Sequence, residues 1–344
     1  MKKLGRTDLN VSKQGLGCMS MSEFYGDPIS DEHGIHLFKV AYDNGVNFFD
    51  TADVYAYGRN EILVGKAIAA LIADKIYRNK IIIATKCGII RDENDSTKRG
   101  VDNSYQYVKD CCEKSLVRLG KEVGRIDLYY LHRIAHGGKQ IDEAMKAMSE
   151  LLSENKIKSA GLSEANAEII QHANDALLKY SNGKHQLAAV QSEYSLMTRN
   201  IESNGVLALC KKLGISFVAY SPLSRALLSG EIVDIEKLPE GDFRKQLPRF
   251  QKENLTHNNT IILKVKELAS QKNCSTAQIA LAWVMQHDNV IPIPGTTKEK
   301  NLLSNIRAQD IRLTDGEIKS LNELQKPIGD RYTESSMKAF EFDE

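Results

Sequence analysis

Four polar residues, each at or just beyond the end of an apolar run, have side chains suited to proton transfer. Asp50 ends the run of residues 46–49, Tyr55 follows it, and Lys86 and His132 end two later runs. A free phenol has a pKa near ~10, so tyrosine exchanges protons at neutral pH only when a cation or a dry site tunes it. An ammonium beside the phenol favours the phenolate, and a carboxylate would hold that ammonium in place. A neutral histidine can donate to a carbonyl oxygen. These four residues are the predicted catalytic group.

The elements that would position them alternate along almost the whole chain. Strand-like runs are short and nearly continuous in Val, Ile, Leu and aromatic residues, which is typical of strands buried on both faces of a parallel sheet. Eight such runs begin at Gly15, Val46, Ile81, Ile126, Ser159, Leu187, Ser216 and Val290. Helices are predicted at about 31–44, 60–73, 104–119, 141–152, 167–180 and 202–213, with two more after Asn258.

Eight β/α units favour an α/β fold of the closed (β/α)8 TIM-barrel type over an open sheet. We also expect an N-terminal hairpin within residues 2–13 and a long loop after the seventh strand, at residues 225–257. The length of 344 residues alone allows one large barrel or two domains; the eight units favour a single domain spanning 1–344. Because the carboxyl ends of parallel strands meet at one face, Asp50, Tyr55, Lys86 and His132 should lie close together.

Other functional classes find little support. With 46 Lys and Arg against 45 Asp and Glu, the chain lacks the basic surface expected of a nucleic-acid binder. No apolar stretch approaches the ~20 residues that cross a bilayer, and the first residues do not resemble a signal peptide, so we expect a cytoplasmic protein. The six cysteines form no CxxC pair, and no metal site is predicted. Residues 15–20 lack the third glycine of a dinucleotide fingerprint.

At this point the chain resembles the aldo-keto reductases, because seven motifs occur in that family's order. They are residues 15–19 (GLGCM), 49–55 (FDTADVY, followed by Asn60 and Glu61), 84–86 (ATK), 126–133 (IDLYYLHR), 161–163 (GLS), 219–223 (AYSPL) and 293–297 (IPGTT). The resemblance covers about the whole chain, and within it a subgroup with bacterial, fungal and plant members is the most similar.

The resemblance implies roles for individual residues. Tyr55 would be the general acid toward the carbonyl of an aldehyde or ketone, Lys86 would lower its pKa, Asp50 would hold Lys86, and His132 would orient the carbonyl. The cofactor would be NADPH in preference to NADH, with hydride leaving nicotinamide C4. The implied cofactor contacts are Ser163 and Gln191 for the carboxamide, Tyr220 for ring stacking, Ser221, Leu223 and Arg225 for the pyrophosphate, and Gly295, Thr296, Lys298 and Asn305 for the adenosine 2′-phosphate end.

Four positions depart from the family pattern. Glu164 stands where many relatives have asparagine, Ala56 replaces the usual glycine after the catalytic tyrosine, and Asn301 and Ser304 replace a common arginine and a common acid. These departures concern the nicotinamide site, the pocket wall and, for the last two, the 2′-phosphate site.

Taken singly, Asp50, Tyr55, Lys86 and His132 each have an ordinary structural interpretation, such as a strand-end cap or a packed ring; their combination favours catalysis. A slow-turnover regulatory or interaction protein on the same barrel is the main alternative, and an unrelated barrel isomerase is a third. The substrate is expected to be a small carbonyl compound, with pyridoxal, aromatic aldehydes and methylglyoxal-like compounds all open. The protein is expected to be a monomer or homodimer.

Overall fold

Eight parallel strands form the centre of the computed structural model, which describes residues 1–95 and 98–339. Their order in the sheet is β12-β11-β10-β9-β8-β5-β4-β3, so strands that follow one another in the chain are neighbours once the hairpin strands are set aside. The strands are β3 (Leu16–Gly17), β4 (Phe48–Asp50), β5 (Ile82–Cys87), β8 (Leu128–Leu131), β9 (Ala160–Ser163), β10 (Ala189–Glu193), β11 (Ser216–Tyr220) and β12 (Val290–Pro292).

The sheet curls until its two edges meet. Gly15 N donates to Pro292 O at 2.9 Å and Gly17 N donates to Pro294 O at 3.4 Å, which joins the first strand to the last. Gly17 is required here, because a Cβ on it would lie 2.8 Å from Ile293 O. The expected (β/α)8 barrel is therefore confirmed, and each of the eight strands begins within two residues of its predicted start.

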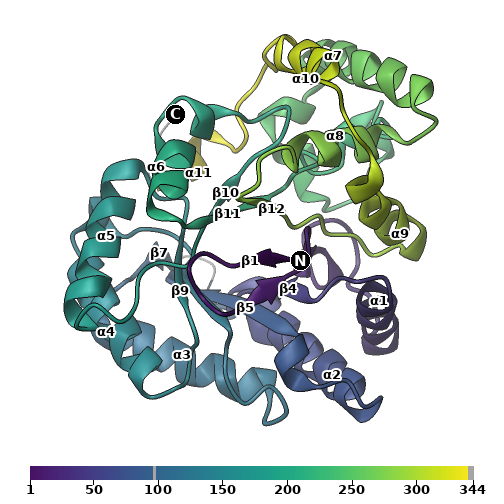
Figure 1. The fold of residues 1–344 in the computed structure, drawn as a ribbon. Coiled ribbons are helices and arrows are strands. Elements are labelled where there is room, and N and C mark those ends of the chain that lie inside the picture. The colour runs from purple at the N-terminus through teal and green to yellow at the C-terminus, as the bar shows by residue number, and fades with distance from the viewer. Residues whose placement is uncertain (96–97, 340–344) are drawn as a thin grey trace.

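Helices cover the outside of the barrel (Figure 1). They are α1 (Asp31–Asp43), α2 (Arg59–Ala73), α3 (Tyr105–Leu119), α4 (Ile141–Ser153), α5 (Ala167–Tyr180), α6 (Val206–Leu213), α7 (Lys252–Gln271), α8 (Thr276–Val284), α9 (Glu299–Arg307), α10 (Asp315–Asn322) and α11 (Glu334–Ala339). Apolar side chains of these helices and the outward side chains of the strands form the larger hydrophobic core. None of these helices combines the length and apolarity needed to cross a membrane.

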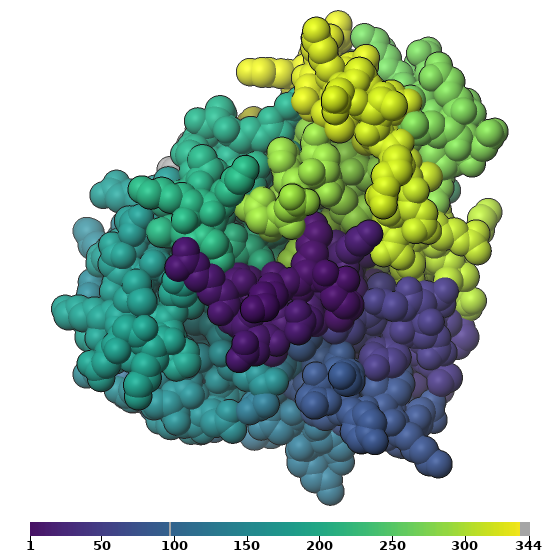
Figure 2. All heavy atoms as spheres, in the orientation of Figure 1, coloured from purple at the N-terminus to yellow at the C-terminus, as the bar shows by residue number. Residues whose placement is uncertain are grey.

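A small hairpin closes the amino-terminal end of the barrel. Strands β1 (Lys2–Lys3) and β2 (Asn10–Val11) pair antiparallel, as predicted. Leu4, Leu9 and Val11 pack on inward side chains such as Phe48 and Leu128 to form a second hydrophobic cluster inside the barrel. Figure 2 shows this hairpin, in purple, lying across the centre of the molecule. The site must therefore lie at the opposite, carboxyl-terminal end.

Three sequence-based boundaries were wrong. Residues 89–103, for which neither a strand nor a helix is predicted above, contain the antiparallel strands β6 (Ile89–Arg91) and β7 (Arg99–Val101). Helix α7 begins at Lys252, so the long loop after the seventh strand ends there rather than at His257. Helix α6 begins at Val206 rather than at residue 202, which is the last residue of a short turn at Asn200–Glu202.

Candidate active site

Strand alternation explains why Asp50 points into the barrel. Successive side chains of a strand point to opposite faces. In β4, Phe48 belongs to the inner cluster, whereas Phe49 packs outward on Phe38 of α1 with ring centroids 4.5 Å apart. Asp50 is the next residue and has the same direction as Phe48. Its carboxylate is thus placed above the apolar floor of the barrel.

The same alternation places Lys86 and His132 inside. In β5, Ala84 is in the inner cluster and Thr85 points outward to the Glu61 carboxylate at 2.6 Å. In β8, Tyr130 points inward and Leu131 outward. Lys86 and His132 follow the outward residues, so both turn back toward the barrel axis. Asp50 is paired with Ala84 in the sheet, and Lys86 with Tyr130. Lys86 and His132 each lie two residues beyond these partners, so Asp50, Lys86 and His132 lie at successive heights along the barrel.

Asp50 and Lys86 form a buried ion pair. The Lys86 Nζ donates to Asp50 Oδ1 and, at 2.8 Å, to the backbone carbonyl of Thr51. The second carboxylate oxygen accepts a hydrogen bond from Gln191 Nε2 at 2.8 Å. The Lys86 and Asp50 side chains are only 1% and 3% exposed. Every charged atom of the pair is therefore matched within the protein, which a buried charge requires.

Tyr55 lies against both Lys86 and His132. The Lys86 Nζ is 5.2 Å from the centre of the Tyr55 ring, and the His132 ring meets it edge-on at 5.6 Å and 83°. Tyr55 starts a short turn, Tyr55–Gly58, in which Ala56 and Tyr57 adopt left-handed backbone angles, with φ of 46° and 55°. Non-glycine residues rarely adopt this conformation. The four predicted catalytic residues thus come together, with strained backbone directly after the tyrosine.

The electrostatics keep the phenol protonated and the imidazole neutral. Burial, and then the negative charge of Asp50, raise the pKa of Tyr55 well above its ordinary value, and Arg133 opposes the shift. Burial, with Arg133 and Lys86, lowers the pKa of His132 well below its ordinary value. Burial also raises the pKa of Asp50, and Lys86 and Gln191 oppose that shift. The cluster can therefore offer a proton from Tyr55 and a neutral hydrogen-bond donor from His132.

Three of the expected cofactor contacts lie beside this cluster. Ser163 and Gln191, at the carboxyl ends of β9 and β10, are buried, and Ser163 Oγ accepts a hydrogen bond from Arg133 at 3.4 Å. Tyr220 ends β11 and is only partly buried. These side chains form a polar and aromatic edge next to Tyr55.

The segment after β11 is held by its own packing and ion-pair contacts. Ser221, Ser224 and Arg225 have positive φ, and Leu223 packs against the outer core. The Arg225 guanidinium is buried and pairs with Glu193 at 3.2 Å. Glu193 also accepts from Thr198 and lies 3.7 Å from Arg249, so a single carboxylate joins two arginines.

The expected adenosine end lies at the start of α9. Lys298 is exposed and precedes the first turn, Thr296 Oγ1 accepts from Lys298 N at 3.2 Å, and Asn305 is buried. Gly295 passes so close to the first strand that a Cβ on it would lie 2.8 Å from Gly17 O. Glu299 stands in the first helical turn, where its charge opposes an anion, and His36 contacts it at 2.8 Å.

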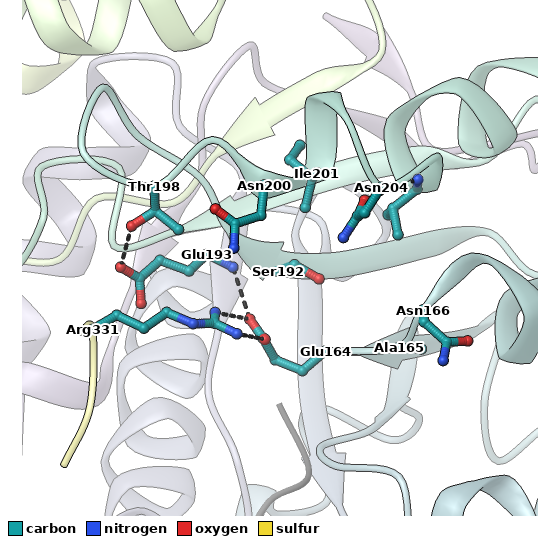
Figure 3. Close-up of a pocket in the computed structure, with 11 residues that line it drawn as sticks. Glu164, Ala165, Asn166, Ser192, Glu193, Thr198, Asn200, Ile201, Asn204 and Arg331 are labelled. Atoms are coloured by element: carbon teal, nitrogen blue, oxygen red, sulfur yellow. Dashed lines mark hydrogen bonds and ion pairs between the residues drawn. The ribbon is translucent and has the colours of Figure 1, made fainter. Parts of the chain in front are cut away.

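Sequence reasoning did not anticipate Arg331 and Tyr332. Both terminal guanidinium nitrogens of Arg331 donate to Glu164, at 3.1 and 2.8 Å, beside a surface pocket (Figure 3). Tyr332 exchanges a hydrogen bond with the Tyr220 hydroxyl at 3.1 Å. The sequence singles out only Glu164, as a departure from the family pattern, and its acidic character is the one signal in the sequence that a cation lies nearby.

Comparison with known proteins identifies the family of the chain. The model of the aldo/keto reductase family matches residues 13–326. The chain belongs to the aldo-keto reductase family. It is 43% identical over 329 residues to the probable aldo-keto reductase 1 of Glycine max, which covers 95% of this chain and 89% of that protein.

Solved aldo-keto reductases share its fold. The glycerol dehydrogenase of Gluconobacter oxydans superposes with a TM-score of 0.78 at 28% identity, covering 92% of each chain. An aldo-keto reductase from Bacillus halodurans, in its holo form, gives 0.72 at 29% identity, covering 94% of this chain and 96% of that one. This aldo-keto reductase is thus one of a family of oxidoreductases that act on small carbonyl substrates with nicotinamide cofactors.

Proposed function

We propose that this aldo-keto reductase reduces aldehydes or ketones to alcohols with Tyr55 as the general acid. The observation that carries the proposal is the arrangement of Tyr55 against Lys86 and His132 above the buried Asp50–Lys86 pair. Burial and the Asp50 charge raise the pKa of Tyr55, which keeps the phenol protonated but opposes release of the proton, so the proposal requires the Lys86 ammonium to stabilise the phenolate as it forms. His132, whose pKa is lowered, would donate a hydrogen bond to the same oxygen.

Lys86 would act when the proton leaves Tyr55. A phenolate formed in a dry site is unfavourable unless a cation lies nearby, and the Lys86 ammonium lies 5.2 Å from the ring. Asp50 and the Thr51 carbonyl fix that ammonium. Asp50 is therefore proposed as the residue that orients Lys86 rather than as a proton donor. This assigns each of the four residues one role.

The polar groups along the mouth fit an extended nicotinamide dinucleotide. Two of the buried side-chain atoms that have no hydrogen-bond partner among the described residues are His132 Nδ1, in the catalytic cluster, and Ser224 Oγ, next to Arg225 in the chain. Ser163 and Gln191 would hold the carboxamide, and Tyr220 would stack on the ring. Ser221, Leu223 and Arg225 would approach the pyrophosphate. When bound, the cofactor supplies the hydride.

NADPH is proposed in preference to NADH. Gly295, Thr296, Lys298 and Asn305 would surround the 2′-phosphate end, with Lys298 as the exposed cation. The single-domain organisation of residues 1–344, the cytoplasmic location and the monomeric or homodimeric state remain predictions.

The test is Tyr55→Phe. We expect NADPH to bind to this variant with unchanged affinity, while reduction of a panel of aldehydes and ketones slows by roughly 10²- to 10⁴-fold. A variant that consumes NADPH as fast as the parent would exclude Tyr55 as the acid. If the parent binds NADPH but no carbonyl in the panel is turned over faster than the cofactor is released, the slow-turnover regulatory protein becomes the better account.

A further inference from the structure

Residues 328–332 run across the carboxyl-terminal face of the barrel and are fixed at their start by Asn258. The side chain of this fully buried residue of α7 binds Ile328 on both sides: Nδ2 donates to Ile328 O at 3.0 Å and Ile328 N donates to Oδ1 at 2.9 Å. The Asn258 amide thus satisfies both the backbone N–H and the backbone carbonyl of Ile328, as a neighbouring β-strand would. It sets the point from which the segment crosses the face.

The next residue, Gly329, is seated against residues 248–249. Its carbonyl accepts from Arg249 Nε at 3.1 Å, and its φ is 86°. A Cβ at this position would lie 2.8 Å from the Pro248 carbonyl carbon and 2.9 Å from Arg249 N. Only glycine permits both this backbone angle and this contact. The segment therefore has a defined path rather than an incidental one.

Arg331 fastens the far end of the segment to the nicotinamide side of the barrel. It makes a bidentate contact with Glu164, and the side chains of the two residues are 11% and 6% exposed. Glu164 Oε1 also accepts from Glu193 N at 2.9 Å (Figure 3). The carboxylate directly follows Ser163, the proposed carboxamide contact. The Glu164 carboxylate thus accepts three hydrogen bonds, two of them from Arg331, and it holds the segment in place.

Tyr332 reaches two further residues of the proposed cofactor site. Its hydroxyl lies 3.1 Å from that of Tyr220, the proposed stacking partner of the nicotinamide. The Arg225 guanidinium lies 4.6 Å from the centre of the Tyr332 ring, a cation–π distance. The segment thus spans from Glu164 to Tyr220 and Arg225, which together mark the nicotinamide and pyrophosphate half of the path.

We propose that residues 328–332 are a strap that closes over the nicotinamide half of the cofactor site, with the Arg331–Glu164 pair as its latch. The inference rests on the proposed function, since it needs the dinucleotide to lie along Ser163, Tyr220 and Arg225. A cofactor in that position lies beneath the strap and enters or leaves only when the latch opens. Opening separates a buried bidentate charge pair, so the strap should slow association and dissociation alike.

The experiment measures both rate constants by stopped-flow fluorescence of NADPH with the full chain. Arg331→Met removes the latch cation, and Glu164→Gln keeps the shape of its partner while removing the charge. Arg312→Met is the matched control, because Arg312 is exposed and the hydrogen bond that its side chain donates, to Gln309 O, is long at 3.4 Å. We expect both latch variants to raise the association and dissociation rate constants about tenfold, with the Kd within about threefold of the parent and Arg312→Met unchanged. The double variant should match the single ones, because each removes the same pair.

Three results would overturn the strap. In the first, both latch variants leave both rate constants within about twofold of the parent. In the second, only dissociation accelerates, which makes Arg331 part of the binding surface. In the third, only association accelerates, which means that the segment competes with the cofactor. Failure of the parent to bind either NADPH or NADH overturns the proposed function itself, so the two failures are distinguishable.

Discussion

Removing the cation from the Asp50–Lys86 pair should reveal how much the barrel depends on it. In Lys86→Met the Asp50 carboxylate keeps its burial and the hydrogen bond from Gln191 but loses its only ion-pair partner among the described residues. Breaking a buried pair by deleting one member costs about 3–5 kcal/mol, because the remaining charge is uncompensated. We expect a loss of that size in the free energy of unfolding at pH 7.

The loss should depend on pH, and its sign follows from the Asp50 proton. Burial already raises the pKa of Asp50, and Lys86 is the larger of the two groups that oppose the rise. Without Lys86 the folded-state pKa moves further above the unfolded value of ~3.9, so the folded state binds the extra proton. Stability of the variant should then fall with rising pH above about 4, by up to ~1.4 kcal/mol per unit, until the folded carboxyl ionises.

The assay is urea unfolding followed by the fluorescence of Trp283, the only tryptophan, which is fully buried and bonded to Asn322. Lys66→Met is the control, because the Lys66–Asp31 pair is about half exposed, with side chains 53% and 46% accessible, and should matter little. Adding Asp50→Asn to Lys86→Met should restore much of the stability and remove the pH dependence. Equal stability of Lys86→Met and the parent at pH 5 and pH 8 would refute the reasoning.

Three other predictions follow from the described contacts. Ala56→Gly should stabilise the fold by up to ~1 kcal/mol, because Ala56 has φ of 46° and glycine relieves that strain; a lower urea midpoint would contradict it. Burial, with Glu61, raises the pKa of Asp53 to about 8 and Arg118 opposes the shift, so folded Asp53 retains a proton that the unfolded chain loses near ~3.9. Stability should therefore fall between about pH 4 and pH 8 in the parent, and Asp53→Asn should flatten that slope in urea midpoints. The lowered pKa of His132 predicts that kcat/KM shows no titration attributable to this residue between about pH 6.5 and 8; a step near 6.5 that His132→Gln abolishes would refute it.

The parts of the fold that were predictable are those with a local cause. All eight strands were recognised because their residues are apolar on both faces, and Asp50, Lys86 and His132 could be grouped because each ends such a run. Strand alternation then fixes which way these side chains point, as the inner Phe48 and outer Phe49 show.

The parts that were missed depend on long-range contacts. Strands β6 and β7 are short and half-exposed, with Arg91 pairing with Arg99 and Ile90 with Gly100, so no alternation marks them. Arg331 meets Glu164 across 167 positions of sequence, and nothing near either residue specifies the partner. Asn258, in a helix predicted to begin after it, acts on a segment 70 residues away.

The hairpin that seals the amino-terminal end of the barrel has a practical consequence. Leu4, Leu9 and Val11 fill that end, so the interior of the barrel can be reached only from its carboxyl-terminal rim. The first residues lie on the outer surface of the closed end. A protein tethered to a sensor or bead through an amino-terminal linker would present its rim to solution. Attachment through the carboxyl end would load the helix that directly follows the strap, and we expect it to alter cofactor exchange where the amino-terminal tether does not.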